Sequence, residues 1–490
     1  MSTRVLGLAS TLILVRLLAP ADFGLVALAT GFWQAVDALS SFGIEEAIIR
    51  EKTPTRDLYD TGFTLNALRG LTMVALIAVS AYPLSRFFEE PRLAPVMFAL
   101  AVAALANGLE NIGIVDFRRD LNFRREFVLN IVPRLAASAL TIAIAFTLRD
   151  YRALIAGILA AALLRLAAGY VLHPYRPSLS LAAWHRIAGF STWSWALSVA
   201  CLARDRLDNA VIGRMLGLGP AGLAPVGVYS VGVEIAGLPI TELVSPLGRA
   251  CFSAFAALRQ TADHQTADRH TTDDLNATFL RLIGSASLIC LPAGVGISLI
   301  ADPIVTLAFG PAWQDAIPLI QLLGIALTAT VLGTISTAML TAFASLRPQF
   351  TTVAAATVFR FAAVVALIPT QGLLGAAIGM SLATVAENLA LTTLALRRLG
   401  IAASALLHHI WRSIAATTAM AAALIWLGLG WTKVPPEFCA PTIALAIPVA
   451  ALLYTAATTA IWLATGRPKG AERDALTMLT TLRRKTIPKA

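Results

Sequence analysis

Ionisable side chains inside long apolar stretches are the residues best suited to do chemistry in this 490-residue chain. A charged side chain at the centre of a membrane-spanning helix costs about 2.5 to 3.5 kcal/mol on insertion scales, unless it meets a partner or a wet cavity. Arginines in such places can offer a diphosphate charge-assisted and often bidentate hydrogen bonds. The candidates for diphosphate binding are Arg69, Arg134, Arg165, Arg204, Arg206 and Arg360.

Carboxylates in the same apolar stretches suggest a second role. Asp37, Glu110 and Glu234 are candidates for binding a coupling proton or sodium ion in a cavity. A simpler interpretation is mutual neutralisation, since Arg204 and Asp208 stand four residues apart on one predicted helix. Both interpretations stay open from the sequence.

Composition decides what must position these residues. With 57% hydrophobic and 13% charged residues, the chain cannot form a water-covered globule, so the bilayer must be its solvent. A helix crossing about 30 Å of hydrocarbon needs about 20 residues, and each stretch is apolar on all faces, unlike a barrel strand. We therefore predict an all-α polytopic membrane protein with about 14 transmembrane helices. The predicted crossings lie near 5–19, 22–44, 61–83, 93–115, 127–148, 153–173, 190–213, 226–250, 278–300, 316–340, 349–369, 373–396, 409–430 and 440–465.

The distribution of Lys and Arg predicts which side faces the cytoplasm, because cytoplasmic connections retain these residues. An even number of crossings places both termini on one side, and the basic tail at 467–490 belongs at an anionic inner leaflet. The net charge of +10 is thus explained by topology, and no nucleic-acid partner is needed. The predicted cytoplasmic cations are Arg50, Lys52, Arg56, Arg118, Arg119, Arg124, Arg125, Arg259, Arg269, Arg281, Arg397, Arg398 and Arg412.

The beginning of the chain permits another interpretation, a cleaved signal peptide. Arg4, the apolar run 5–15 and the triplet Ala19-Pro20-Ala21 imitate one. Arg16 stands late in that run, and only about eleven uncharged residues separate it from Arg4. A first helix that begins upstream of Met1 explains the pattern better.

Catalytic and metal-binding patterns are missing from the sequence. It has no phosphate-binding glycine loop, no zinc-binding helix and no serine elbow, so we expect no catalytic residues and no cofactor. Four scattered cysteines predict packing rather than a metal site or a disulfide. The polar run at about 254–277 carries two histidines and four aspartates without regular ligand spacing, and we expect a solvated loop. Transport is therefore favoured over catalysis.

An internal repeat supports transport. Two pairs of similar segments occupy corresponding places in the two halves, each half with six crossings. Units with an even number of crossings give parallel repeats that flank a central cavity. The segments are 16–24 with 214–229, and 87–91 with 309–313.

Several stretches carry a resemblance to a known family. The sequence resembles the bacterial polysaccharide transporters, the O-antigen and exopolysaccharide flippases of the multidrug/oligosaccharidyl-lipid/polysaccharide exporter superfamily. The matching stretches are 16–25, 117–125, 207–217, 228–230 and 237–239, whereas the connection at 218–226 is longer than usual for the group.

The resemblance implies an architecture. It implies an N-terminal six-helix lobe at 1–175, a C-terminal six-helix lobe at 176–400, two accessory helices at 401–466 and the cytoplasmic tail at 467–490. It also implies a cargo, an undecaprenyl-diphosphate-linked oligosaccharide that alternating access moves across the cytoplasmic membrane. The expected partners are this lipid-linked cargo, membrane lipids, a polysaccharide polymerase and its chain-length machinery.

Two other functions stay open. A multidrug or toxin antiporter of the same superfamily favours an acidic cavity for cationic substrates, whereas arginines outnumber acids among the candidates here. A membrane polymerase or ligase of the same pathway needs a large external loop with catalytic residues, and the external connections here are short.

Overall fold

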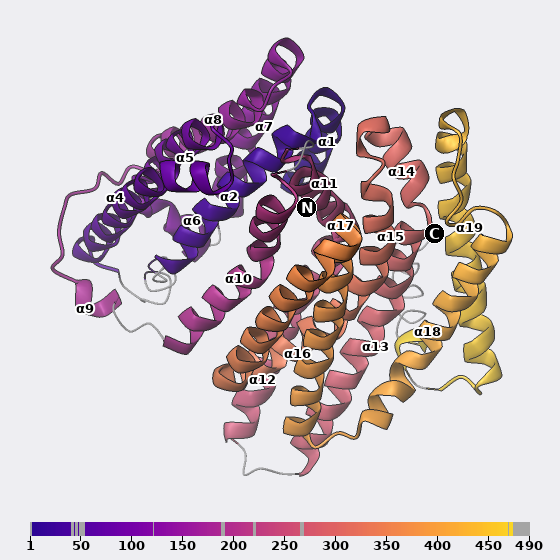
Figure 1. The fold of residues 1–490 in the computed structure, drawn as a ribbon. Coiled ribbons are helices and arrows are strands. Elements are labelled where there is room, and N and C mark those ends of the chain that lie inside the picture. The colour runs from indigo at the N-terminus through magenta and orange to yellow at the C-terminus, as the bar shows by residue number, and fades with distance from the viewer. Residues whose placement is uncertain are drawn as a thin grey trace, which may run out of the picture. The chain divides into compact units, whose positions relative to one another are not determined.

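The computed structural model describes most of the chain, namely residues 2–40, 44, 48, 54–120, 122–187, 192–218, 222–264, 269–468 and 470–473. Every regular element in these ranges is a helix (Figure 1), which confirms the predicted all-α class. The predicted cytoplasmic cations Arg50 and Lys52 and most of the predicted tail lie outside the described residues.

Contacts divide the chain into two compact units, Met1–Ser230 and Val231–Ala490. The first unit contains α1 (Ser2–Leu17), α2 (Pro20–Leu39), α4 (Arg56–Phe87), α5 (Leu93–Gly108), α6 (Val115–Arg119), α7 (Phe123–Leu148), α8 (Arg152–Leu172), α9 (Trp184–Ile187), α10 (Thr192–Met215) and the first turns of α11 (Ala224–Ala236).

The second unit continues with a π-helical turn at Ile240–Val244 and eight α-helices. They are α12 (Ser245–His264), α13 (Arg269–Leu299), α14 (Ala301–Ala308), α15 (Ala316–Ala326), α16 (Thr330–Ala342), α17 (Leu346–Leu399), α18 (Ala403–Trp426) and α19 (Pro436–Ala464).

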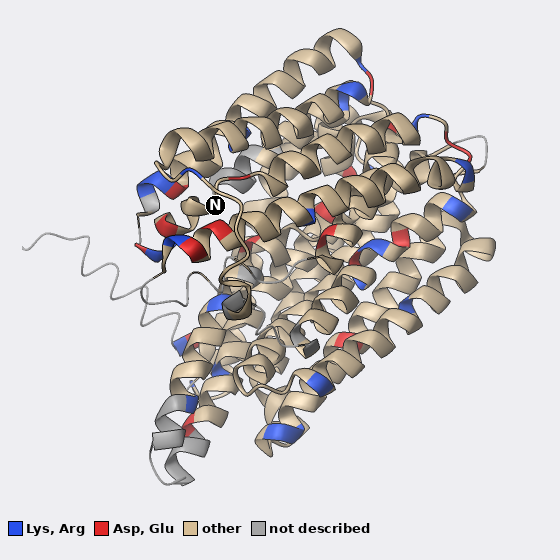
Figure 2. Ribbon diagram, turned by 90° about the vertical axis from the view of Figure 1, so that its left-hand side faces the viewer, with Lys and Arg blue, Asp and Glu red and all other residues tan. Residues whose placement is uncertain are grey.

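Length and composition identify the membrane-spanning helices. Within the described residues, seven helical segments are long and apolar enough to cross a bilayer, and two bent pairs raise the number to nine. The predicted count of fourteen therefore stays a prediction. Blue and red segments are sparse along the long helices (Figure 2), as insertion into hydrocarbon requires.

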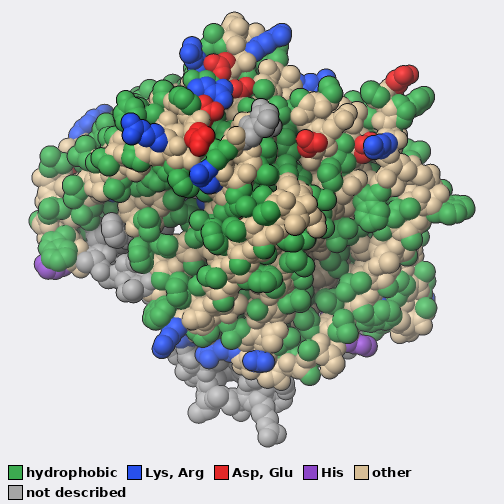
Figure 3. All heavy atoms as spheres, in the orientation of Figure 1, with side chains coloured by type: hydrophobic (Ala, Val, Ile, Leu, Met, Phe, Trp, Pro, Cys, Tyr) green, Lys and Arg blue, Asp and Glu red, His purple; other side chains and the backbone are tan. Residues whose placement is uncertain are grey.

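Large apolar side chains also face outward. Val79 on α4, Val358 on α17 and Leu452 on α19 are 76%, 69% and 69% exposed. Green side chains cover much of the face shown in Figure 3. Exposed apolar surface of this extent is unsuited to water, so the chain is a multi-pass membrane protein.

The segment α17 contains two helices that meet at a kink, where the sequence also separates two crossings. The 54-residue α17 covers both predicted crossings 349–369 and 373–396, and its backbone breaks at Gly372 with φ 56° and ψ −135°. A Cβ atom at Gly379 would lie 3.0 Å from Cγ2 of Val364, so the two halves pack closely. A Cβ atom at Gly375 would lie 2.3 Å from the Leu367 carbonyl oxygen, so both glycines permit this close packing.

Two predictions about connections are wrong. The predicted loop at 254–277 is largely helical, because α12 continues to His264 and α13 begins at Arg269. Polar residues extend these two helices beyond their apolar segments, because many polar residues have good helix propensity in water. Arg412, predicted as a loop cation, instead lies in α18, where its side chain is buried and pairs with Glu472 at 3.2 Å.

The connections between the helices of the first unit form two groups, one at each end of the helices. Successive helices run in opposite directions, so alternate connections lie at the same end. The backbone N–H of Tyr151 bonds to Asp22, and Arg92 stacks on the Tyr151 ring, so three predicted external connections meet. Asp60 and Asp116 bond to the chain that follows α8, so three predicted cytoplasmic connections also meet. The alternation of sides is consistent with the charge pattern.

The internal repeat has a geometric counterpart at the first turns of α2 and α11. A Cβ atom on Gly24 would lie 3.0 Å from the nitrogen of Gly227, and one on Gly227 would lie 3.0 Å from the nitrogen of Gly24. Each would also strike the carbonyl four residues before its partner, Leu223 or Pro20. This reciprocal contact brings the backbones of the two helices together at residues that belong to the paired segments.

We predict that Gly24→Val and Gly227→Val each destabilise the protein by about 1 to 3 kcal/mol, because backbone atoms cannot yield to a side chain. Thermal unfolding of the purified protein in detergent measures the loss. Gly296→Ala on α13 is the control, since nothing lies within 4 Å of its added Cβ atom. Unchanged melting of both valine variants would contradict the close contact.

Candidate functional site

A charged pair inside the first unit joins Arg165, a candidate for diphosphate binding, to Glu110, a candidate for ion coupling. Nε of Arg165 on α8 donates to Oε1 of Glu110 at 2.6 Å. Another guanidinium nitrogen of Arg165 donates to Oδ1 of Asn130 on α7 at 2.7 Å. Glu110 balances the arginine charge, which makes a cation tolerable in an apolar helix.

Glu110 stands at a break in a membrane-spanning segment. Helix α5 ends at Gly108, and the chain resumes after a 63° bend with a 3₁₀ turn at Ile112–Ile114 that leads into α6. The buried Asn111 stabilises the bend, since its side chain accepts from the Gly113 N–H and donates to the Tyr175 carbonyl. Broken helices of this kind expose polar groups where transporters bind their cargo or ions.

Arg165 lines a groove of about 800 Å³ between α1, α7 and α8. Arg134 lies on the same groove and is exposed, with its guanidinium against Gly7. Within the described residues, Arg134 has no acidic partner. The remaining polar lining comes from Ser10, Glu126, Asn130, Ser138 and Thr141. Two arginines beside amide and hydroxyl groups supply the hydrogen-bond donors that an anion with polar substituents requires.

A second pair joins Arg69 on α4 to Asp37 on α2. The guanidinium also donates to the Asp37 carbonyl and to Ser40 Oγ, each at 3.3 Å. These contacts end α2 and attach it to α4. The carboxylate of Asp37 therefore neutralises Arg69, as that of Glu110 neutralises Arg165.

Helix α10 carries two of the candidate arginines, in different surroundings. Arg204 pairs with the neighbouring Asp205 at 2.8 Å, while Asp208 accepts a hydrogen bond from the Tyr229 hydroxyl at 2.6 Å. Sequence spacing suggests Asp208 as a partner of Arg204, which stays a prediction, and the structure adds the adjacent Asp205 as a partner. Arg206 lines a separate apolar pocket.

The remaining candidates lie in the second unit. Arg360 and Glu387 are buried on the two halves of α17, at 7% and 5% exposure, and both make contacts with neighbouring groups. Glu234 on α11 is exposed. The structure thus places the nine candidates in several sites, and two of the predicted carboxylates neutralise predicted arginines.

A polar cluster at the start of α4 and in the chain after α8 was not among the sites predicted from the sequence. Asp60 accepts from the Tyr175 hydroxyl and from Ser178 Oγ at 2.6 Å, and burial together with this bond raises the pKa of Tyr175. Nε2 of His173 lies 3.4 Å from Asp116, yet burial lowers the pKa of His173. The only sequence signal for this cluster was the presence of acidic residues beside predicted cytoplasmic connections. That signal could not identify their partners, which are distant in sequence. The cluster fixes the chain after α8 to α4 and α6.

Two solved transporters share this fold. The lipid II flippase MurJ in an inward closed conformation aligns with a TM-score of 0.72 at 12% identity, covering 94% of this chain and 97% of that chain. An inward-facing multidrug resistance MATE family transporter of the MOP superfamily aligns at 0.66 and 17% identity, covering 81% and 94%. The chain shares the fold of these two transporters.

Sequence comparison identifies the family. Residues 13–318 match the polysaccharide biosynthesis protein family, so the chain belongs to it. This confirms the resemblance seen in the sequence.

Named relatives point the same way. The Escherichia coli lipopolysaccharide biosynthesis protein WzxC is 26% identical over 65% of this chain and 62% of its own length. The Rhizobium meliloti succinoglycan biosynthesis transport protein ExoT is 23% identical over 64% and 61%. The chain thus spans somewhat under two thirds of these two relatives. An uncharacterized membrane protein of a Klebsiella pneumoniae cps region is 23% identical over 76% and 75%.

We predict strong coupling between Arg165 and Glu110. Arg165→Ala leaves the carboxylate without its cation and Glu110→Ala does the reverse, so the double variant loses at least about 1 kcal/mol less than the sum of the single losses. Thermal unfolding of the four proteins in detergent closes the cycle. Additive losses would show that the two side chains do not support each other.

Proposed function

We propose that this protein is a flippase that moves undecaprenyl-diphosphate-linked oligosaccharide units across the bacterial cytoplasmic membrane by alternating access. The observation that supports it most directly is the groove lined by Arg134 and Arg165. A diphosphate with sugar substituents needs paired cations beside amide and hydroxyl groups, and this groove offers both. Membership of the polysaccharide biosynthesis family supports the choice of cargo.

In the mechanism that we propose, the first step is binding of the cargo diphosphate by the two arginines of the groove. A diphosphate entering the groove meets Arg134 first, since no described acid neutralises it. Arg165 then shares its guanidinium donors between Glu110, Asn130 and the cargo, because three nitrogens carry five N–H groups. The two predicted lobes, 1–175 and 176–400, alternate around the cargo, while 401–466 forms the accessory pair.

The orientation that we propose follows the charge pattern. Both termini face the cytoplasm, where Lys and Arg accumulate, and the polysaccharide polymerase with its chain-length machinery receives the cargo on the other side. An antiporter for cationic drugs fits less well, since Arg134 lacks an acidic partner among the described residues. A polymerase or ligase fits less well because the shared fold is that of transporters.

Deletion of the gene tests the proposal in cells. We expect complete lipid-linked repeat units to accumulate on the cytoplasmic leaflet, as a leaflet-specific probe applied to spheroplasts measures. Normal translocation with unpolymerised units outside would contradict a flippase and favour a polymerase or ligase. Unchanged lipid-linked oligosaccharides would favour the antiporter.

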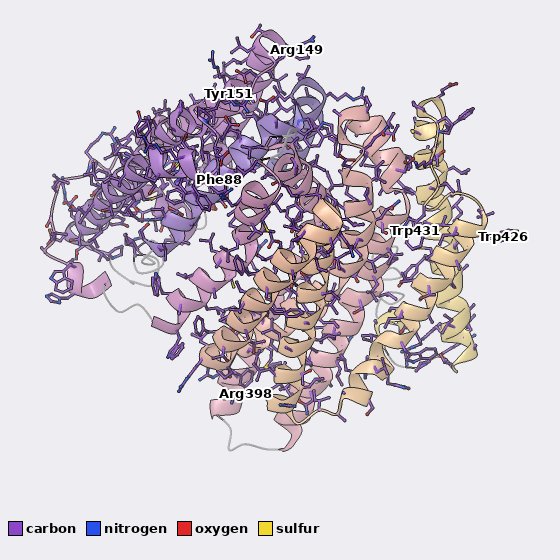
Figure 4. The ribbon with its side chains drawn as sticks, viewed as in Figure 1. Phe88, Arg149, Tyr151, Arg398, Trp426 and Trp431 are labelled. Atoms are coloured by element: carbon purple, nitrogen blue, oxygen red, sulfur yellow. The ribbon has the colours of Figure 1, made fainter. Side chains whose placement is uncertain are left out.

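Complementation tests the groove itself. Arg134→Gln and Arg165→Gln should each lower surface polysaccharide at least about tenfold, since a hydrogen bond to a charged group contributes about 1.5 to 3 kcal/mol. Arg398→Gln is the matched control, because Arg398 lies exposed in the last turn of α17 (Figure 4). Immunoblots of membranes establish equal insertion. Normal polymer from both groove variants would exclude this groove from transport.

A further inference from the structure

The chain between α8 and α9 passes beside the first turns of α4 as a strap of residues 173–184, which is non-helical up to Trp184 (Figure 1). Three backbone N–H groups of this strap donate to side-chain oxygens of α4, at 3.0, 2.9 and 3.1 Å. The pairs are Ser178 with Asp60, Ser180 with Thr64, and Ala183 with Thr61. Asp60 and Thr61 are 4% and 0% exposed, so the strap shields the polar start of α4.

The large apolar side chains of the strap are exposed. Leu179, Leu181 and Trp184 are 77%, 52% and 49% exposed, although the backbone that carries them is bonded to α4. Polar groups turned toward the protein and apolar side chains turned away from it reverse the arrangement that water favours. A cluster of this kind indicates contact with another apolar phase.

The backbone of the strap also suits a place with little water. Besides the three bonds to α4, the N–H of Ala182 donates to Ser180 Oγ at 3.3 Å, and that of Trp184 donates to the Leu181 carbonyl at 3.2 Å. Non-helical backbone is tolerated at membrane depth only where the protein satisfies its polar groups. Each of the N–H groups named here meets that condition.

The face of α4 that the strap covers continues as an exposed apolar surface. Thr64 and Leu68 follow Asp60 by four and eight residues and therefore lie on its side of the helix. Leu68 and Leu71 are each 56% exposed on this membrane-spanning helix. The 32 residues of α4 extend over about 48 Å, more than the roughly 30 Å of hydrocarbon, so its first turns lie at headgroup level. The strap lies at that level, beside the lipid that covers Leu68 and Leu71.

Cations flank the strap. Arg176 is exposed, and its guanidinium donates to the carbonyls of His173 and Tyr175 at 2.9 and 3.0 Å. The side chain of Arg56, at the start of α4, is 74% exposed. Arginine beside tryptophan is typical of the membrane surface, where the cation meets anionic headgroups and the ring enters the boundary with the acyl chains.

We propose that the strap is an interfacial anchor. Leu179, Leu181 and Trp184 enter the lipid of one leaflet, and Arg56 and Arg176 contact the phosphates of anionic phospholipids. The anchor goes beyond the proposed function and does not depend on the cargo, because it concerns contact with the bilayer rather than transport.

Depth measurements test the anchor in the full-length protein. The four native cysteines are replaced by alanine, and Leu179→Cys carries a nitrobenzoxadiazole label in liposomes of phosphatidylethanolamine and phosphatidylglycerol. The control is Arg398→Cys with the same label, since Arg398 lies exposed in the last turn of α17. Thermal unfolding checks that each labelled protein is folded.

The anchor places the two labels in different phases. We expect a phospholipid that is spin-labelled near its headgroup to quench position 179 at least about fivefold more than position 398, and iodide on both sides of the membrane to do the reverse. Iodide quenching as strong at position 179 as at position 398 would overturn the proposal.

Photo-cross-linking in cells identifies what covers the strap. Leu179 and Leu181 are replaced in turn by p-benzoylphenylalanine, with position 398 again as the control, and mass spectrometry reports the adduct. We expect phospholipid adducts at positions 179 and 181 and none at position 398. Adducts with a protein, including a second copy of this chain, would overturn the assignment to lipid.

Arginine variants test the headgroup contacts. Spin-labelled phosphatidylglycerol should quench position 179 at least about twofold more than spin-labelled phosphatidylcholine, and Arg56→Gln combined with Arg176→Gln should abolish this preference. Arg152→Gln is the matched control that keeps it, because the exposed Arg152 lies at the end of α8 far from the strap. Equal quenching by the two lipids in the protein with both arginines would overturn the headgroup contacts.

Discussion

The cost of charge in hydrocarbon is the constraint on which the rest of this structure depends. Arg165 and Arg69 lie within helices that span the membrane, and each has a carboxylate partner on another helix, Glu110 or Asp37. Helices brought together by these pairs need no large apolar driving force, which lipid cannot supply. Arg134 and Arg206 depart from the rule, since the described residues give neither an acidic partner. We propose that an anionic cargo completes the electrostatics at Arg134.

Small residues and broken helices supply the remaining geometry. Gly24 and Gly227 let the first turns of α2 and α11 touch through their backbones. Gly372 divides α17 into two helices that pack against each other. The bend after Gly108 leaves Glu110 within reach of Arg165. The glycine contacts and the kink allow helices to pack closely, and the bend brings a charged residue to its partner.

Sequence predicted the helical class, most crossing positions and the family, because hydropathy is a local property that survives without tertiary context. It also selected Arg165 and Glu110 as candidates, although for different roles, and the structure pairs them. Partner choice could not be predicted, since Glu110 and Arg165 are 55 residues apart and meet only through the packing of α5 against α8. Spacing on one helix suggested Asp208 for Arg204 and did not indicate the adjacent Asp205, which pairs with it. The burial of Arg412 depends likewise on Glu472, 60 positions further along the chain.

Reconstitution of the purified protein tests the central claim most directly. Liposomes containing it are loaded with a fluorescent undecaprenyl-diphosphate-linked oligosaccharide, and a membrane-impermeant reagent measures how much reaches the outer leaflet. The account predicts transfer by the wild-type protein and at least about tenfold slower transfer by Arg134→Gln and Arg165→Gln. Transfer by liposomes without protein at the same rate, or by both variants at the wild-type rate, would contradict it.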